Sequence, residues 1–143
     1  MQKNIGQIYT SNNITIKQDQ INKYAEASGD DNPIHLDEAF AQNSNFGGIV
    51  AHGLLILAQI SELLTSIFGI NWVNNGHLDV RFRRPVYLKD SIQSIIEIVS
   101  IESDNDKSKI SCKVSCVKNN DDSVIVGTAN IYIPENKEGK VNV

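Results

Sequence analysis

The feature that most constrains the fold is a long apolar run in the middle of the chain, from His52 to Gly69 (HGLLILAQISELLTSIFG). Its apolar residues cover most of a helix's circumference, and such a helix is either buried in a protein or spans a membrane. The run offers about 16 residues, roughly 24 Å, and Gln59, Ser61 and Glu62 interrupt it, so it falls short of a span. The sequence therefore predicts a core helix and no membrane partner.

The residues after this helix alternate as strands do. A first strand is expected at HLDVRFR, with Leu78, Val80 and Phe82 facing inward. Three longer runs follow, near residues 91–101, 108–118 and 123–133. Polar turns separate them, so consecutive antiparallel hairpins are expected. Together with a short strand and a helix before the core helix, this order predicts an α+β fold, one long helix wrapped by an antiparallel sheet.

Length and charge narrow the class of protein. The chain has 143 residues and no internal repeat or linker, which predicts a single domain over 1–143. A polar C-terminal tail is expected over about 134–143. The net charge of −4 gives no electrostatic basis for a nucleic-acid partner. The first ten residues, MQKNIGQIYT, do not have the pattern of a signal peptide, so a cytoplasmic protein is expected.

The two cysteines are expected to be buried, reduced thiols. Cys112 and Cys116 lie in the alternating segment KISCKVSCVK and share a face with Ile110 and Val114. Four residues of strand separate the two by about 13 Å, too far for a disulfide. No further Cys or His stands nearby in the sequence to complete a metal site.

The segment SGDDNPIH, Ser28–His35, places acids, a proline and a histidine directly after a predicted helix. That helix, QDQINKYAEAS, is expected to start at an N-cap Asp19 and to stop at Gly29. Pro33 is expected to keep the helix from resuming at once, and to push the preceding residue toward extended geometry.

Two interpretations of this segment are open from its residues. If the loop folds back, Asp30 and His35 can share proton removal and delivery near neutral pH. Alternatively, Asp30 and Asp31 cap a turn and His35 is an ordinary loop histidine. Spacing alone favours the second interpretation, because short motifs recur by chance.

The segment GGIVAHG leads into the core helix and places Gly53 at the helix N-terminus. Backbone N–H groups there are oriented donors with a partial positive charge, suited to a developing oxyanion. A glycine also lets a substrate approach the backbone closely. The alternative is that Gly47, Gly48 and Gly53 only permit a tight turn.

Together, SGDDNPIH, DEAFAQN and IVAHGLL resemble the signature of the MaoC-like, R-specific enoyl-CoA hydratases. FRRPVYLKDSI resembles that family's strand with F-x-x-P-V and an Asp a few residues on. The resemblance runs from about Tyr24 to beyond Ile92, and G-D-x-N-P-x-H is its specific part. It implies a hot-dog fold and the reversible addition of water to trans-2-enoyl-CoA, giving (3R)-3-hydroxyacyl-CoA, with no cofactor and no metal.

Carried over by position, the resemblance implies roles for five residues. Asp30 and His35 would form the catalytic pair, and Asn32 would orient their loop. The N–H of Gly53 would receive the thioester oxygen. Ser61 matches a family serine that hydrogen-bonds within the site.

Further charged residues have weaker assignments. Asp31 occupies a variable position, and His52 is expected to orient the loop before the core helix. Arg81, Arg83 and Arg84 could bind coenzyme A phosphates, although an outward charged strand face is the commoner case. The spacing of the acids and histidines matches no metal-site pattern.

These observations predict a cytoplasmic hot-dog hydratase or dehydratase, a homodimer that acts on acyl-CoA or acyl-carrier-protein thioesters. The nearest alternative enzyme is a hot-dog thioesterase, and another is a non-catalytic acyl-thioester-binding domain. The loop containing Asp30, Asn32 and His35 favours the hydratase.

Overall fold

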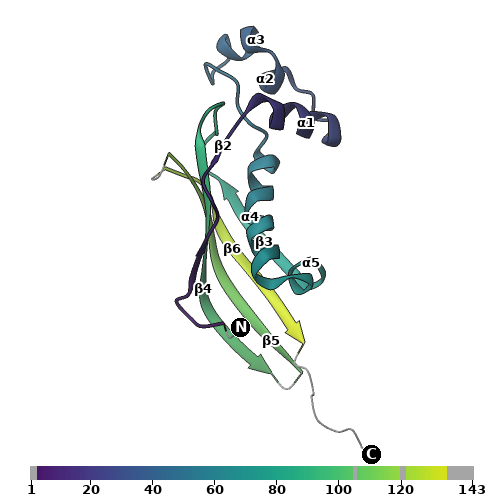
Figure 1. Cartoon of the computed structure of the whole chain (residues 1–143), viewed down its shortest axis with the longest axis vertical. Coiled ribbons are helices and arrows are strands. Elements are labelled where there is room, and N and C mark those ends of the chain that lie inside the picture. Colours follow the sequence, from purple (N-terminus) through teal and green to yellow (C-terminus); the bar gives the residue numbers. More distant parts are fainter. Residues whose placement is uncertain (1–2, 105, 120–121, 135–143) are drawn as a thin grey trace, which may run out of the picture.

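One antiparallel sheet with a long helix packed on it forms the body of the protein (Figure 1). The structure is a computed structural model and describes residues 3–104, 106–119 and 122–134. The helices are α1 (Gln18–Ser28), α2 (Pro33–Leu36), α3 (Glu38–Gln42), α4 (Gly53–Phe68) and α5 (Ile70–Asn75), and the strands are β1 (Ile8–Thr10), β2 (Ile14–Thr15), β3 (Gly76–Phe82), β4 (Ser91–Asp104), β5 (Lys107–Lys118) and β6 (Asp122–Pro134).

The sheet has the strand order β1-β4-β5-β6-β3, and β2 also pairs with β4. The three long strands form the two predicted antiparallel hairpins, with Ile96 opposite Val114 and Val114 opposite Gly127. The strand β3 does not pair with β4, its neighbour in sequence, but with β6, where Gly76 lies opposite Ile131. This crossover places the end of β3 beside the start of β6.

The helix α4 confirms the predicted core helix along one stripe. Ile56, Ile60, Leu64 and Phe68 are buried and follow each other at intervals of four residues, which places them on one face toward the sheet. Fully burying such a side chain stabilises the fold by about 1.5–3 kcal/mol. The other apolar faces of the helix are not fully buried within the chain, and Leu54 is 59% exposed.

The helices α1, α2 and α3 gather beyond one end of the sheet, where α4 begins (Figure 1). The helix α1 has the predicted extent and stops at Gly29, whose φ of 77° suits glycine. The prediction that Asp19 is its N-cap was wrong. The N-cap is Lys17, whose N–H donates to Gln20 Oε1 at 2.8 Å, and Asp19 instead pairs with Lys23 at 2.8 Å in the first turns.

The helix does not resume at once after Gly29, as expected, but a second helix starts at Pro33 itself. Pro33 begins α2 only five residues after α1 ends, because proline suits the first position of a helix, where no N–H is needed. Asn32 has the extended ψ of 128° expected before proline, and its Oδ1 accepts from Ile34 N at 3.0 Å. The sequence did not predict α2, α3 and α5 as helices.

Both cysteines are free and buried, as predicted. Cys112 and Cys116 lie on the inner face of β5 with Ile110 and Val114. Burial raises the pKa of each thiol to about 11. Of the expected C-terminal tail, Pro134 ends β6 and residues 135–143 lie outside the described part of the chain. Among the described residues, no helix combines the length and the apolar character needed to cross a membrane.

Candidate active site

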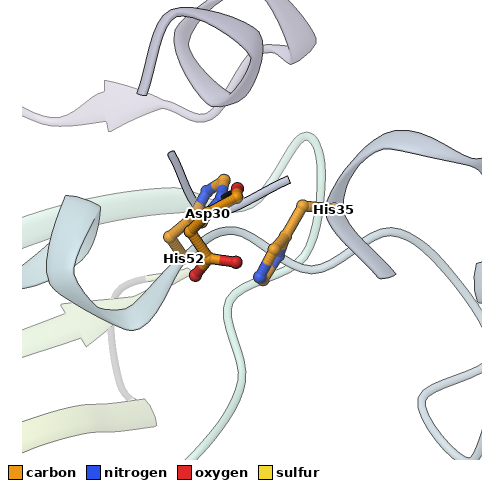
Figure 2. Close-up of side chains that lie close together, drawn as sticks. All are labelled: Asp30, His35 and His52. Carbon is orange, nitrogen blue, oxygen red and sulfur yellow. Dashed lines mark hydrogen bonds between the residues drawn. The ribbon is translucent and has the colours of Figure 1, made fainter. Parts of the chain in front are cut away.

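The loop after α1 folds back, so that Asp30 and His35 meet at the start of α4. One potential ligand atom from each of Asp30, His35 and His52 lies within 4.8 Å of the others. Figure 2 shows the Asp30 carboxylate and the His35 ring pointing toward one another, with His52 beside them. Asp30 is exposed, His35 is half-buried and His52 is buried. The fold therefore brings the predicted acid–base residues together at a partly solvated position.

The hydrogen bonds of His35 determine which ring nitrogen is free. Its Nδ1 lies 2.6 Å from the carbonyl oxygen of Val50, and a carbonyl can only accept, so Nδ1 carries the proton and donates. The lone pair is then on Nε2, which can accept a proton. The backbone of His35 is also held, because Gln18 Nε2 donates to its carbonyl oxygen at 3.0 Å.

Asp30 and His35 form no direct hydrogen bond with each other in the described structure. Asp30 Oδ1 accepts only weakly from Asn32 N, at 3.4 Å, so its carboxylate keeps free lone pairs. A water that hydrogen-bonds at about 2.8 Å to each of two groups can bridge them across the distance seen here. The pair can therefore hold one water between them.

His52 contacts both members of the pair. Its Nε2 donates to the backbone carbonyl of Asp30 at 2.9 Å. Its ring stacks on His35, with centroids 3.7 Å apart and planes inclined by 26°, and packs against Tyr24 with centroids 4.7 Å apart. Its Nδ1 is buried without a hydrogen-bond partner. His52 thus holds the loop that carries Asp30 and His35 against the start of α4.

Gly53 begins α4 immediately after His52. The carbonyl of His52 accepts from Leu55 N at 3.1 Å and Ile56 N at 3.3 Å. Among the described residues, neither Gly53 N–H nor Leu54 N–H has an acceptor. Unpaired N–H groups of a first turn, at the positive end of the helix dipole, bind anionic oxygen. The predicted oxyanion donor is therefore available next to the acid–base pair.

The FRRPVYLKD segment holds the loop in front of α4. Ala51 N donates to Val86 O at 2.8 Å, and Val50 forms an antiparallel bridge with Tyr87. Because the carbonyl of Val50 is the acceptor of His35 Nδ1, this segment indirectly sets the position of the His35 ring.

Asp90, the acid of the same segment, is structural. Its carboxylate accepts from Tyr87 N at 2.9 Å and from Asn119 Nδ2 at 3.0 Å, and lies 3.3 Å from Lys118 Nζ. Burial alone would raise the pKa of Asp90, but these hydrogen bonds and the lysine together hold it below the usual value.

Two hollows meet at the start of α4. The first, the acid–base hollow, has a volume of about 220 Å³, and the second, the arginine cavity, has about 370 Å³. Gly53 and Phe82 line both. The acid–base hollow is also lined by Tyr24, Asp30, His35, His52 and Leu54. The arginine cavity, which is open to solvent, is lined by residues from 46–56, 82–86 and 124–125, which include Arg83 and Arg84.

Phe82 faces the start of α4, on the face of β3 that also carries Leu78 and Val80, as predicted, but it is not buried there, because β3 ends at this residue. It is 54% exposed, and its Cε1 lies 3.0 Å from where a Cβ on Gly53 would stand. The sequence analysis missed both Phe82 and Tyr24 as residues of the site. Tyr24 shares an α1 face with Ile21 and Ser28, and nothing local distinguishes it from a core residue.

The structure does not bring Ser61 to this group. Its hydroxyl accepts from Trp72 Nε1 at 3.0 Å, and eight residues of helix, about 12 Å, separate it from Gly53. The arginines divide between two positions: Arg83 and Arg84 line the arginine cavity, while Arg81 lies on β3 outside that lining. Arg84 pairs with Asp122 at 2.6 Å.

The donor types of Asp30, His35 and His52 could in principle hold a divalent cation. The lone pairs left after hydrogen bonding are the carboxylate oxygens, His35 Nε2 and His52 Nδ1. Two stacked rings hold their lone pairs in two nearly parallel planes, however, and one ion between them cannot lie in both planes. The arrangement suits a bridging water better than a metal.

Comparison with known proteins assigns the fold and the family. The family model described as "MaoC like domain" matches residues 1–120. The chain belongs to the MaoC-like domain family. Its fold is accordingly the hot-dog fold, as the sequence predicts. An unliganded R-hydratase from Pseudomonas aeruginosa has a TM-score of 0.80 and 26% identity to this MaoC-like chain, covering 99% of it and 91% of that protein.

Relatives of known activity agree with this assignment. A 3-hydroxybutyryl-CoA dehydratase from Methylorubrum extorquens is 33% identical over 116 residues, which are 80% of this chain and 71% of that protein. A mitochondrial 3-hydroxyacyl-acyl-carrier-protein dehydratase from Arabidopsis thaliana is 28% identical over 118 residues, 81% and 69% of the two chains. The MaoC-like chain is therefore similar in sequence to hydratases and dehydratases.

Proposed function

We propose that this protein catalyses the reversible, R-specific addition of water to trans-2-enoyl thioesters, giving (3R)-3-hydroxyacyl thioesters. One observation carries the proposal. The His35 ring, whose Nε2 is left free, and the Asp30 carboxylate lie close enough to share a water, beside Gly53, whose N–H has no acceptor among the described residues. The names of the relatives, which include an R-specific enoyl-CoA hydratase from Aeromonas caviae, support the same reaction class.

The chemistry follows from these positions. In hydration, the water gives its oxygen and one hydrogen to C3 of the substrate as a hydroxyl group. The Asp30–His35 pair takes up the other proton and returns a proton to C2, so the balance is one water per double bond. As the oxygen attaches to C3, negative charge develops on the thioester oxygen. Gly53 N–H is placed to stabilise this charge.

Hydrolysis of the same thioester is the alternative reaction. A water held between two groups that can take up a proton is also able to attack a thioester carbonyl. The Gly53 N–H would serve either reaction. Products separate the two, because hydrolysis releases a free thiol and hydration does not.

The test uses crotonyl-CoA as substrate and follows the absorbance of the enoyl thioester, with chiral analysis of the product and a thiol assay in parallel. Loss of absorbance with a (3R)-hydroxy product and no released thiol supports the proposal. Released thiol without a hydroxyacyl product contradicts it, and so does an (S)-product.

Variants of the pair connect the activity to the site. Asp30→Asn and His35→Ala should each lower turnover by about 10²–10⁴-fold. The double variant should be little worse than either, because residues that act as a unit are not additive. Asp31→Asn is the control expected to be mild, since Asp31 is exposed and lies outside the lining of the acid–base hollow. Full turnover of a folded Asp30→Asn protein would refute the assignment.

We further propose that the chain forms one domain, acts as a homodimer and works in the cytoplasm. Large apolar side chains remain exposed on α4 and α5, including Leu54, Ile70 and Val73, and a second copy could cover them. The two reduced, buried thiols agree with a reducing compartment.

A further inference from the structure

The arginine cavity lies beside the acid–base hollow and takes no part in the proton transfers described above. Its walls are mainly apolar and its volume is about 370 Å³. Gly53 and Phe82 form the boundary between the two spaces. We propose that this cavity binds the phosphopantetheine arm of the thioester carrier, with Arg83 as the ligand of its phosphate. This inference rests on the proposed function.

The order of atoms in an enoyl thioester decides which end of the substrate lies there. C3 and C2 must be at Asp30 and His35, and the oxygen on C1 must be at Gly53 N–H. The sulfur and the carrier arm follow C1 on the side away from C2. The space that lies past Gly53 from the acid–base pair is the arginine cavity, so the arm enters it. The acyl tail, which continues beyond C3, starts from the opposite side, near Tyr24 and Leu54.

The chemistry of the cavity fits this arm. A phosphopantetheine arm is a long uncharged pantetheine chain that ends in a phosphate, and mainly apolar walls with a cation at the edge complement both parts. Arg84 already pairs with Asp122 at 2.6 Å. Arg83 is exposed, and no acidic group within the described residues pairs with its side chain. Arginine binds phosphate through two parallel hydrogen bonds, so Arg83 can supply this contact without losing another.

The position of Arg83 is fixed by the fold. Its backbone N–H donates to Val124 O at 2.7 Å, which ties the segment after β3 to the start of β6. By contrast, Arg81 is also exposed but lies on β3, outside the lining of the cavity. The two residues therefore form a matched pair: the same side chain and similar exposure, with different access to the cavity.

The experiment compares three crotonyl thioesters, those of pantetheine, phosphopantetheine and coenzyme A. The first two differ only by the phosphate. Arg83→Gln should lower kcat/KM for the phosphopantetheine and coenzyme A thioesters by about tenfold, mainly through KM, and leave the pantetheine thioester unchanged. Arg81→Gln should change none of the three.

Three outcomes would overturn the inference. One is an equal effect of Arg83→Gln on all three thioesters, and another is no effect on any. The third is an effect on coenzyme A alone, which would assign Arg83 to the adenosine part of coenzyme A. The alternative that the acyl tail occupies the cavity is tested with 2-octenoyl-CoA. If Arg83→Gln lowers kcat/KM more for 2-octenoyl-CoA than for crotonyl-CoA, the tail lies there instead of the arm.

Binding of free coenzyme A, measured by calorimetry, separates this inference from the proposed reaction. Weaker binding to Arg83→Gln than to wild type, with Arg81→Gln unchanged, supports the carrier site even if the enzyme fails to hydrate crotonyl-CoA. If the wild type hydrates crotonyl-CoA, but neither turnover nor coenzyme A binding changes in Arg83→Gln, the proposed reaction stands and the carrier site is refuted.

Discussion

The proposed oxyanion role of Gly53 can be tested by placing a single methyl group beside its N–H. In Gly53→Ala, the new Cβ would stand 3.0 Å from Phe82 Cε1 and 3.2 Å from Phe82 Cδ1. The Phe82 ring is 54% exposed, so it can move by the few tenths of an ångström that this contact requires. Gly53 does not have a positive φ, so alanine is not strained there.

Stability and activity should therefore respond differently to this substitution. In a helix interior, replacing glycine by alanine stabilises the fold by about 1 kcal/mol. At this helix start, that gain and the cost of the close contact between the new Cβ and Phe82 should nearly cancel. We expect the free energy of unfolding to stay within about 1 kcal/mol of wild type. The methyl group would, however, block the thioester oxygen from the N–H. Losing one such donor typically costs about 10²–10³ in turnover, or 2.7–4 kcal/mol.

The assay is turnover of crotonyl-CoA, with urea unfolding of the same samples. Gly48→Ala is the matched control, because its Cβ would meet only Tyr87 Cδ1, at an ordinary 3.9 Å, and its φ is not positive. Gly47 is unsuitable, since its φ is 69°. The double variant Gly53→Ala with Phe82→Ala tests whether a displaced ring is the cause. Wild-type turnover of Gly53→Ala would show that the oxygen is held elsewhere, and recovery in the double variant would refute obstruction by the methyl.

Three further predictions follow from other contacts. His52→Phe keeps a ring against His35 but loses the donor to Asp30 O, so kcat should fall about tenfold with little change in KM. His52→Gln can still donate and should keep most of kcat. Equal losses of kcat in both variants would contradict the positioning role. The raised pKa of Cys112 and of Cys116, about 11 against 9.0 for a free thiol, means that burial favours the neutral thiol. The full stabilisation is present below pH 9, and the free energy of unfolding in urea should fall between pH 9 and 11 by roughly 3 kcal/mol per thiol. A double Cys→Val variant should lack that fall. Light scattering should give a dimer near twice 15.8 kDa, and a stable, active monomer would contradict the proposed assembly.

Much of the fold was predictable because its signals are local. Alternation along each long strand and the polar turns between them identify both hairpins. The apolar run from 52 to 69 identifies the helix, although only one stripe of it is buried. The pairing of β3 with β6 was not predictable, because no local sequence pattern indicates that a strand pairs with a strand other than its neighbour in sequence. The helices α2, α3 and α5 have four to six residues, too few for a helical period to appear.

The site was predictable only as far as its chemistry is carried by side chains. Asp30, His35 and Gly53 were identified from their residue types and their motif, and the fold brings them together. Ser61 was assigned by position in a motif, and the fold directs its hydroxyl to Trp72 instead. Phe82 faces α4 as alternation predicts, but the strand ends there, so its ring lines the two hollows instead of being buried.

Several contacts that arrange the site belong to the backbone, which explains why the motif alone could not reveal them. The carbonyl of Val50 fixes the tautomer of His35, and the carbonyl of Asp30 receives His52. Neither of these two atoms depends on which side chain its residue carries. The carbonyl of Val50 depends instead on the bridge between Val50 and Tyr87, and so on the segment after β3. A substitution that loosens this bridge should therefore impair catalysis without touching a catalytic side chain, because His35 would lose the acceptor that keeps its Nε2 free.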